Sequence, residues 1–92
     1  MENLFTKLKE KGIPERMHGG LVRYIERGVP AGDFLMAVLR NDLRGAFDRA
    51  DDENAQILRR YVMFLYNDAP AGCWGSPENV KNWIDSGGFY GK

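Results

Sequence analysis

Residues 32–54 read GDFLMAVLRNDLRGAFDRADDEN, and this stretch decides the predicted fold. Its apolar residues recur every three or four positions, the spacing that places side chains on one face of an α-helix. The polar pair Asn41 and Asp42 interrupts this pattern. Because Asn and Asp favour caps over helix interiors, we expect one helix to end at Asn41 and Asp42 to cap the next; a single continuous helix is the alternative. The apolar face, which we expect to pack into the core, comprises Phe34, Leu35, Val38, Leu39, Leu43, Ala46, Phe47 and Ala50.

The rest of the chain predicts further short helices and no strands. The acidic cluster at 51–54 is typical of a first helical turn, and it predicts one strong helix that continues to about Tyr66 with Val62 on its buried face. Ser76 and Pro77 favour the start of a last helix, which ends before Gly87. Other helices are expected over about 2–11, 14–27 and 30–40.

We therefore predict an all-α fold: a single small domain of about five or six short helices in an irregular bundle. Residues 1–12 form an N-terminal arm or short helix, 13–88 form the core and 89–92 form a tail. A chain of 92 residues is near the lower limit for a self-sufficient core, so association between copies is expected. The aromatic tail residues Phe89 and Tyr90 favour the same conclusion, a homo-oligomer.

The composition excludes several classes of function. Thirteen basic and thirteen acidic residues cancel, so no overall charge draws the chain to nucleic acid or to an anionic membrane. The single cysteine, Cys73, and the single histidine, His18, leave no basis for an internal disulfide or a zinc cluster. We expect no metal and no cofactor. His18 has no accompanying catalytic group and is expected to be exposed, and the N-terminus lacks an apolar signal segment, so a cytoplasmic location is expected.

The polar residues around the central interruption form one candidate binding site. Arg40, Asn41, Asp42 and Arg44 lie within about one helical turn, and arginine side chains bind phosphate and carboxylate groups through two parallel hydrogen bonds. Arg40 and Arg44 are four positions apart, as are Arg23 and Arg27, so each pair shares a helix face. These arginines either clamp an anion or form surface ion pairs, and Asn41 and Asp42 act either as caps or as ligand contacts.

A second candidate feature is the loop tryptophan Trp74, which lies between glycines and outside any helical pattern. It either closes an edge of the core or offers an aromatic surface to a nucleobase or a partner protein. Tyr66 and Asn67, just upstream, are expected to share that surface. No set of residues typical of an enzyme accompanies these groups, so we expect a binding protein and not a catalyst.

Two blocks, GVPAGDFLMAVLRNDL and YNDAPAGCWGSP, carry a resemblance to a known group of sequences. Residues 13–88 resemble a family of small, mostly uncharacterised proteins encoded by bacteriophages and prophages. The resemblance implies a short phage accessory protein, and many such proteins counter host defence. It assigns no catalytic or binding residues.

Taken with the arginines and loop aromatics, the resemblance leads to a specific expectation about function. The protein is expected to sequester a small nucleotide-like immune signal without catalysis, in a pocket near Arg40, Asn41, Asp42, Arg44, Tyr66, Asn67 and Trp74. The alternative is a phage inhibitor that binds a host defence effector protein directly.

Overall fold

The computed structural model describes residues 3–91, and within that range it is all-helical, without strands. The all-α prediction is confirmed. The described chain forms seven α-helices where five or six were predicted, and none of them is long and apolar enough to cross a membrane. Residues 1–2 of the predicted arm and residue 92 of the predicted tail lie outside this range. The helices are α1 Leu4–Glu10, α2 Glu15–Arg27, α3 Asp33–Leu39, α4 Leu43–Arg49, α5 Asp52–Gln56, α6 Leu58–Asp68 and α7 Pro77–Asp85, with short 3₁₀ turns η1 Ala71–Cys73 and η2 Phe89–Gly91.

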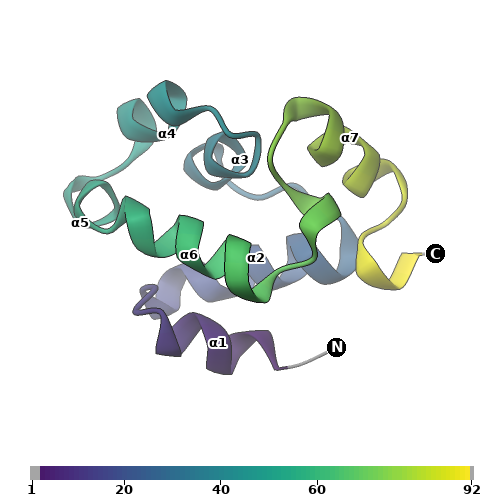
Figure 1. Cartoon of the computed structure of the whole chain (residues 1–92), viewed down its shortest axis with the longest axis horizontal. Helices are drawn as coiled ribbons and strands as arrows, with labels where there is room; N and C mark the ends of the chain where they lie inside the picture. The colour runs from purple at the N-terminus through teal and green to yellow at the C-terminus, as the bar shows by residue number, and fades with distance from the viewer. Residues whose placement is uncertain (1–2, 92) are drawn as a thin grey trace.

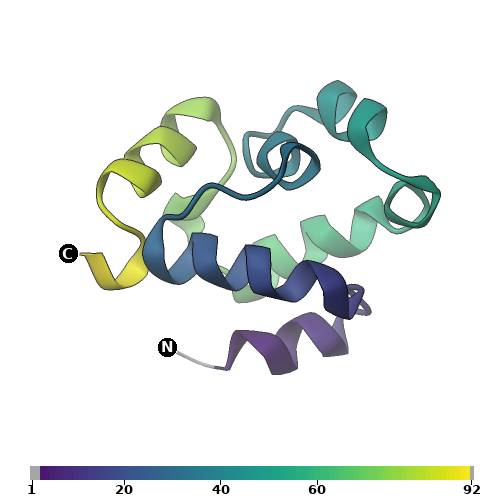
Figure 2. The ribbon, with the colours of Figure 1, turned by 180° about the vertical axis from the view of Figure 1, so that it is seen from behind.

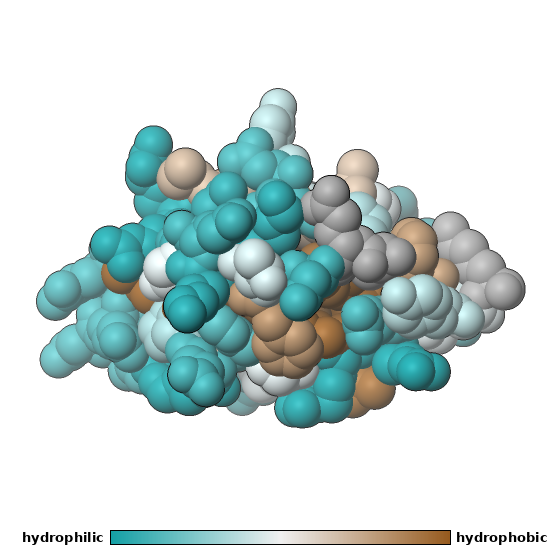
Figure 3. All heavy atoms as spheres, turned by 90° about the horizontal axis from the view of Figure 1, so that it is seen from below, coloured by the Kyte–Doolittle hydropathy of each residue, from teal (hydrophilic) through white to brown (hydrophobic). Residues whose placement is uncertain are grey.

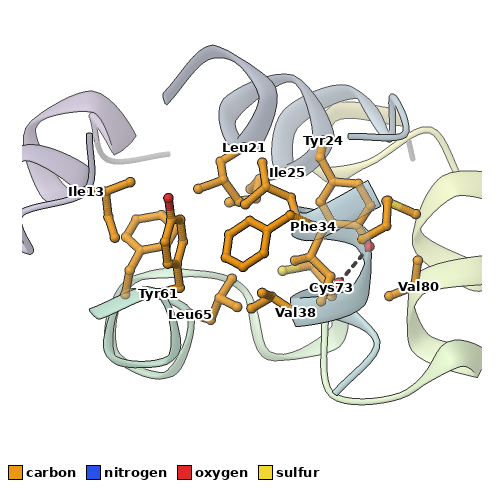
Figure 4. Close-up of a cluster of buried hydrophobic side chains, with 14 of the residues drawn as sticks. Ile13, Leu21, Tyr24, Ile25, Phe34, Val38, Tyr61, Leu65, Cys73 and Val80 are labelled. Carbon is orange, nitrogen blue, oxygen red and sulfur yellow. Dashed lines mark hydrogen bonds between the residues drawn. The ribbon is translucent and has the colours of Figure 1, made fainter. Parts of the chain in front are cut away.

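Helices α2 and α6 form two opposite sides of the core. Figure 1 shows α6 in front with α2 behind it, and the reverse view in Figure 2 shows α2 in front. Helix α1 lies below both and α3 lies above them. Large side chains from these helices meet inside, and the fully buried Tyr24, Tyr61 and Phe64 are the largest of them. Phe34 packs edge-on against Tyr61 with ring centroids 5.2 Å apart, at the centre of the cluster in Figure 4.

The predicted break between two helices at Asn41 and Asp42 is confirmed. Asn41 has a φ of 61°, in the left-handed region that asparagine tolerates better than most residues. The Asp42 N–H donates to Ala37 O at 2.9 Å, and the Asn41 N–H donates to Val38 O at 3.0 Å, which is the Schellman pattern of a helix C-terminus. The Asp42 carboxylate then accepts the Gly45 N–H at 2.9 Å and caps α4.

We expect Asp42→Ala to lower the free energy of unfolding by about 1 kcal/mol, because the N-cap acceptor of α4 is lost. Asp42→Asn is the matched variant, since asparagine caps as well as aspartate. Urea unfolding followed by circular dichroism measures both. If Asp42→Asn were as destabilising as Asp42→Ala, the negative charge and not the cap would be the stabilising feature.

One continuous helix was predicted from the acidic cluster to Tyr66, and this prediction is wrong. The segment forms two helices, α5 and α6, which accounts for the additional helix. Asp51 caps α5 by accepting the Asn54 N–H at 2.8 Å, but the chain breaks at Ile57 before α6 begins. Buried Asn54 accepts the Tyr61 hydroxyl at 2.7 Å. In a continuous helix, these two residues would be two turns, about 10 Å, apart along the axis, so the break allows this buried bond to form. Helix α6 also continues beyond the predicted end at Tyr66, as far as Asp68.

Part of the predicted core face lies outside the core. Phe34, Leu35, Val38, Leu39 and Ala46 are buried as expected, whereas Leu43 is 71% exposed and Phe47 is 62% exposed. Val62 on α6, also predicted to be buried, is 43% exposed. The turn at Asn41 and Asp42 gives α4 its own axis, so the apolar pattern of α3 does not continue along the same buried surface. Only Gly45 and Ala46 of α4 are buried.

The C-terminal part of the chain packs against the end of α2. The predicted start of the last helix is confirmed, because the Ser76 hydroxyl accepts the Asn79 N–H at 3.1 Å and Pro77 is the first helical residue. From α7, the Trp83 indole N–H lies 3.1 Å from both Tyr24 O and Ile25 O. Tyr24 in turn donates its hydroxyl to Cys73 O at 2.7 Å, the dashed line in Figure 4. Burial raises the pKa of the Cys73 thiol to about 12, so this thiol stays protonated at neutral pH.

Candidate functional site

Three arginines line a surface hollow of about 390 Å³, which we call the arginine hollow. It lies between α2, the start of α3, the end of α4 and the start of α5. The volume is within the range of about 300–1,000 Å³ that is usual for small-molecule sites. Its charged and amide lining groups are Arg16, Arg23, Arg49, Asp33, Asp51 and Asn54.

One of these arginines is already neutralised within the chain. Arg16 donates to Asp51 and to Glu53, each at 2.9 Å. The hydrogen bond to Glu53 and the neighbouring Asp51 raise the pKa of Arg16. The pKa of Asp51 is lowered, chiefly by the cap hydrogen bond from the Asn54 N–H and then by the charge of Arg16. Arg16 therefore fixes the start of α5 against α2 and forms one wall of the hollow.

The other two arginines are available to a ligand. Within residues 3–91, neither Arg23 nor Arg49 forms an ion pair. Arg49 donates one hydrogen bond, at 3.3 Å, to Gly45 O, and its remaining donors have no acceptor in that part of the chain. Both side chains belong to exposed residues. Two unpaired guanidinium groups on one hollow can bind phosphate or carboxylate oxygens with charge-assisted hydrogen bonds.

A second hollow, of about 370 Å³, adjoins the first because both are lined by Asp33 and Arg49. Arg40 and Asp42 lie on its other side. Arg40 also forms no ion pair within residues 3–91. Arg49 thus lines both hollows, the first together with Arg23 and the second together with Arg40.

The structure brings together some of the residues predicted to form a site near the helix break. Arg40 and Asp42 share the second hollow, and Asn41 and Asp42 share a shallow groove beside α6. The left-handed backbone of Asn41 ends α3, and the carboxylate of Asp42 caps the start of α4. Asp42 still has a second carboxylate oxygen that can face a ligand.

The remaining predicted residues lie away from these hollows. Among the four hollows described within residues 3–91, none is lined by Arg44, Tyr66, Asn67 or Trp74. Tyr66 is 79% exposed on α6, and no hydrogen bond or ring contact in the described chain joins it to Trp74.

Trp74 is half-buried at the edge of the core, next to the end of α3. Its carbonyl oxygen accepts the Asn79 side-chain amide at 2.9 Å. The next residue, Gly75, donates its N–H to Leu39 O at 2.8 Å. This bond brings the backbone of Trp74 close to that of Arg40, while Trp74 is partly buried against the core.

The two arginine pairs, for which clamping an anion was one of two predicted roles, are each divided among the hollows described. Arg23 lines the arginine hollow, whereas Arg27 lies over the Tyr90 ring, 5.7 Å from its centroid. Arg40 lines the second hollow and Arg44 lines neither. Sequence reasoning did not single out Arg49, because nothing in the local pattern indicates that the end of α4 lies beside α2.

His18 is buried, contrary to the prediction that it is exposed. It is 8% exposed, and its Nε2 lies 2.8 Å from Ile13 O, to which the ring N–H donates. It borders a broad hollow of about 630 Å³ between α1 and α2, together with Phe5 and Lys9. Within residues 3–91, no His, Cys, Asp and Glu side chains are grouped so that they could hold a metal ion.

Comparison with known protein families, curated proteins and solved structures finds no match to this chain. The resemblance to a phage-encoded family therefore stays a prediction from the sequence blocks.

Proposed function

We propose that the protein binds a small nucleotide-type ligand in the arginine hollow and sequesters it without catalysing a reaction. The observation that carries this proposal is the pair of unpaired arginines, Arg23 and Arg49, on a hollow of about 390 Å³. The biological role that fits, given the resemblance to phage accessory proteins, is counter-defence: the protein lowers the free concentration of an immune signal in the host cell.

The mixed charge of the hollow favours a nucleotide over a simple inorganic anion. Guanidinium groups of Arg23 and Arg49 match phosphate oxygens, while the carboxylate of Asp33 can accept hydrogen bonds from ring or amino N–H groups of a base. A single phosphate would use the arginines and leave a carboxylate facing it, which is electrostatically unfavourable. The neutral net charge also argues against a long polyanion, because no overall positive charge draws one to the chain.

The test is titration calorimetry of the whole chain against cyclic dinucleotides, cyclic trinucleotides and cyclic ADP-ribose isomers. We expect heat from at least one of them, and we expect Arg49→Gln and Arg23→Gln each to weaken that binding by about tenfold to 100-fold. Arg59→Gln is the matched control, because Arg59 is an exposed arginine on α6 that lines neither the arginine hollow nor the second hollow. Chromatography of the ligand after incubation should recover it intact.

Two results would contradict the proposal. One is the absence of heat from every ligand at high micromolar concentration. The other is binding that is insensitive to Arg23→Gln and Arg49→Gln but is lost in Trp74→Ala, which would place the site at the loop aromatics predicted from the sequence.

The alternative function is direct inhibition of a host defence effector protein. The partly exposed indole of Trp74 favours it, because tryptophan is enriched among residues that dominate protein interfaces. If this alternative holds, a pull-down from the host should recover one protein in stoichiometric amount. Trp74→Ala should abolish that recovery, and the nucleotides named above should give no heat in calorimetry.

A further inference from the structure

Helices α4 and α6 together present exposed apolar side chains, which we call the α4/α6 face: Leu43, Phe47, Val62 and Tyr66. Their exposed fractions are 71%, 62%, 43% and 79%. Figure 3 views the molecule from below, the side of α1 and opposite to α4, and there the surface is mostly hydrophilic with small separate apolar areas. Four large apolar groups on two neighbouring helices are a different kind of surface.

Two of these four side chains, Leu43 and Val62, line one groove, and helical spacing places the other two one turn further along their helices. Leu43 and Val62 line the same shallow groove between α4 and α6, which Ala46 and Leu58 also line. Phe47 follows Leu43 by four residues and Tyr66 follows Val62 by four, so each extends its helix face by one turn. The groove holds only about 40 Å³, too little for a nucleotide-sized ligand. A nearly flat apolar surface of this kind fits another protein surface.

The area is sufficient for a weak symmetric dimer. With about 150–250 Å² for a large side chain, the exposed fractions correspond to roughly 400–600 Å² of surface on each copy. Pairing two such faces buries about 1,000 Å², near the lower limit for specific interfaces and consistent with a micromolar dissociation constant. An apolar patch of this size on a single chain is itself often functional.

The charges around the face favour a second copy of the same chain. Arg44 and Asp48 are exposed on α4, and Arg59 is exposed on α6. None of the three forms an ion pair within residues 3–91. A border with both signs can complement itself in a two-fold arrangement, where each surface meets an identical one. The zero net charge means that two copies do not repel each other.

We propose that the α4/α6 face is the interface of a two-fold homodimer. The predicted aromatic tail is a weaker candidate, because Tyr90 is already packed against Phe89 and under Arg27. The dimer leaves the arginine hollow open: Arg49 follows Phe47 by two residues, about 200° around α4, and so points away from the interface. Dimerisation through this face is therefore independent of ligand binding in the hollow.

Light scattering coupled to size-exclusion chromatography tests the dimer, at concentrations up to about 100 µM. The mass expected for the dimer is twice the 10.5 kDa of the chain. Phe47→Asp and Tyr66→Asp should each halve the measured mass at the same concentration. Phe5→Asp is the matched control, because Phe5 is 51% exposed on α1, outside the face, and it should leave the mass at the dimer value. Circular dichroism confirms that each variant is folded.

Three outcomes would overturn the proposal. One is a monomer mass for the unmodified chain over the whole concentration range. Another is a dimer that persists in both α4/α6 variants. The third is an unmodified chain that is monomeric alone and binds a host protein through Phe47 and Tyr66, which would assign the face to a different partner.

Discussion

Gly88→Ala is expected to lower the free energy of unfolding by about 3–5 kcal/mol, combining backbone strain with forced repacking. Gly88 has a φ of 79°, which an alanine adopts only with strain. A Cβ at this position would also meet the backbone nitrogen of Gly28 and, at 2.6 Å, that of Arg27. The two glycines let the end of α7 lie directly on the end of α2, and neither backbone can move without disturbing its helix.

Two other glycines provide the control for this prediction. A Cβ added at Gly32 or Gly72 would meet no neighbouring atom within 4 Å, and neither residue adopts a positive φ. Gly72→Ala should stay within about 0.5 kcal/mol of the unmodified chain in urea unfolding, and Gly32→Ala should lose at most about 1 kcal/mol, because Gly32 is the N-cap of α3. If Gly88→Ala were equally mild, the close contact between α2 and the C-terminal segment would be wrong.

Trp83→Ala should cost about 3–5 kcal/mol, the range for truncating a large buried aromatic side chain. Trp83 is 6% exposed, and its indole N–H donates a hydrogen bond shared between the carbonyl oxygens of Tyr24 and Ile25. Trp83→Phe separates the two contributions, because it keeps an aromatic ring and loses the hydrogen bond. We expect about 1–3 kcal/mol for that variant. Equilibrium urea unfolding followed by far-ultraviolet circular dichroism measures both.

Trp74→Ala is the comparison that makes the Trp83 prediction specific. Trp74 is only half-buried, and the hydrogen bond from Asn79 goes to its backbone carbonyl oxygen, which alanine keeps. Its truncation should therefore cost about 1–2 kcal/mol, less than that of Trp83. Equal losses for the two variants would contradict the assignment of Trp83 as the tryptophan that joins α7 to α2.

The helix ends show which features of the fold local sequence patterns can predict. The break at Asn41 and Asp42 and the start of α7 at Ser76 follow from groups that cap a helix within three residues of themselves, so they could be predicted. The break at Ile57 could not, because no proline or glycine marks it. The break lets Asn54 accept the Tyr61 hydroxyl, and the partners of this buried bond are brought together only in the assembled core.

Exposure of the α4 side chains has a similar cause. The three-and-four spacing correctly identified a helical face through Leu39, but the spacing assumes a common axis for α3 and α4. Once Asn41 turns the chain, α4 has its own axis and packs on the core through Gly45 and Ala46, the only two of its residues that are buried. Leu43 and Phe47 consequently lie on the surface, where they form the proposed dimer interface.

The sequence by itself determined the all-α class, the zero net charge, the buried apolar face of α3 and the caps of α4 and α7. These features depend on composition or on neighbours within about one helical turn, and such local interactions form regardless of how the helices pack together. Only the tertiary structure decided which arginines share a hollow. Arg23 and Arg49 are 26 residues apart, on helices whose approach is set by packing across the whole core. For the same reason, only the fold could separate Arg23 from Arg27 and assign them different surroundings.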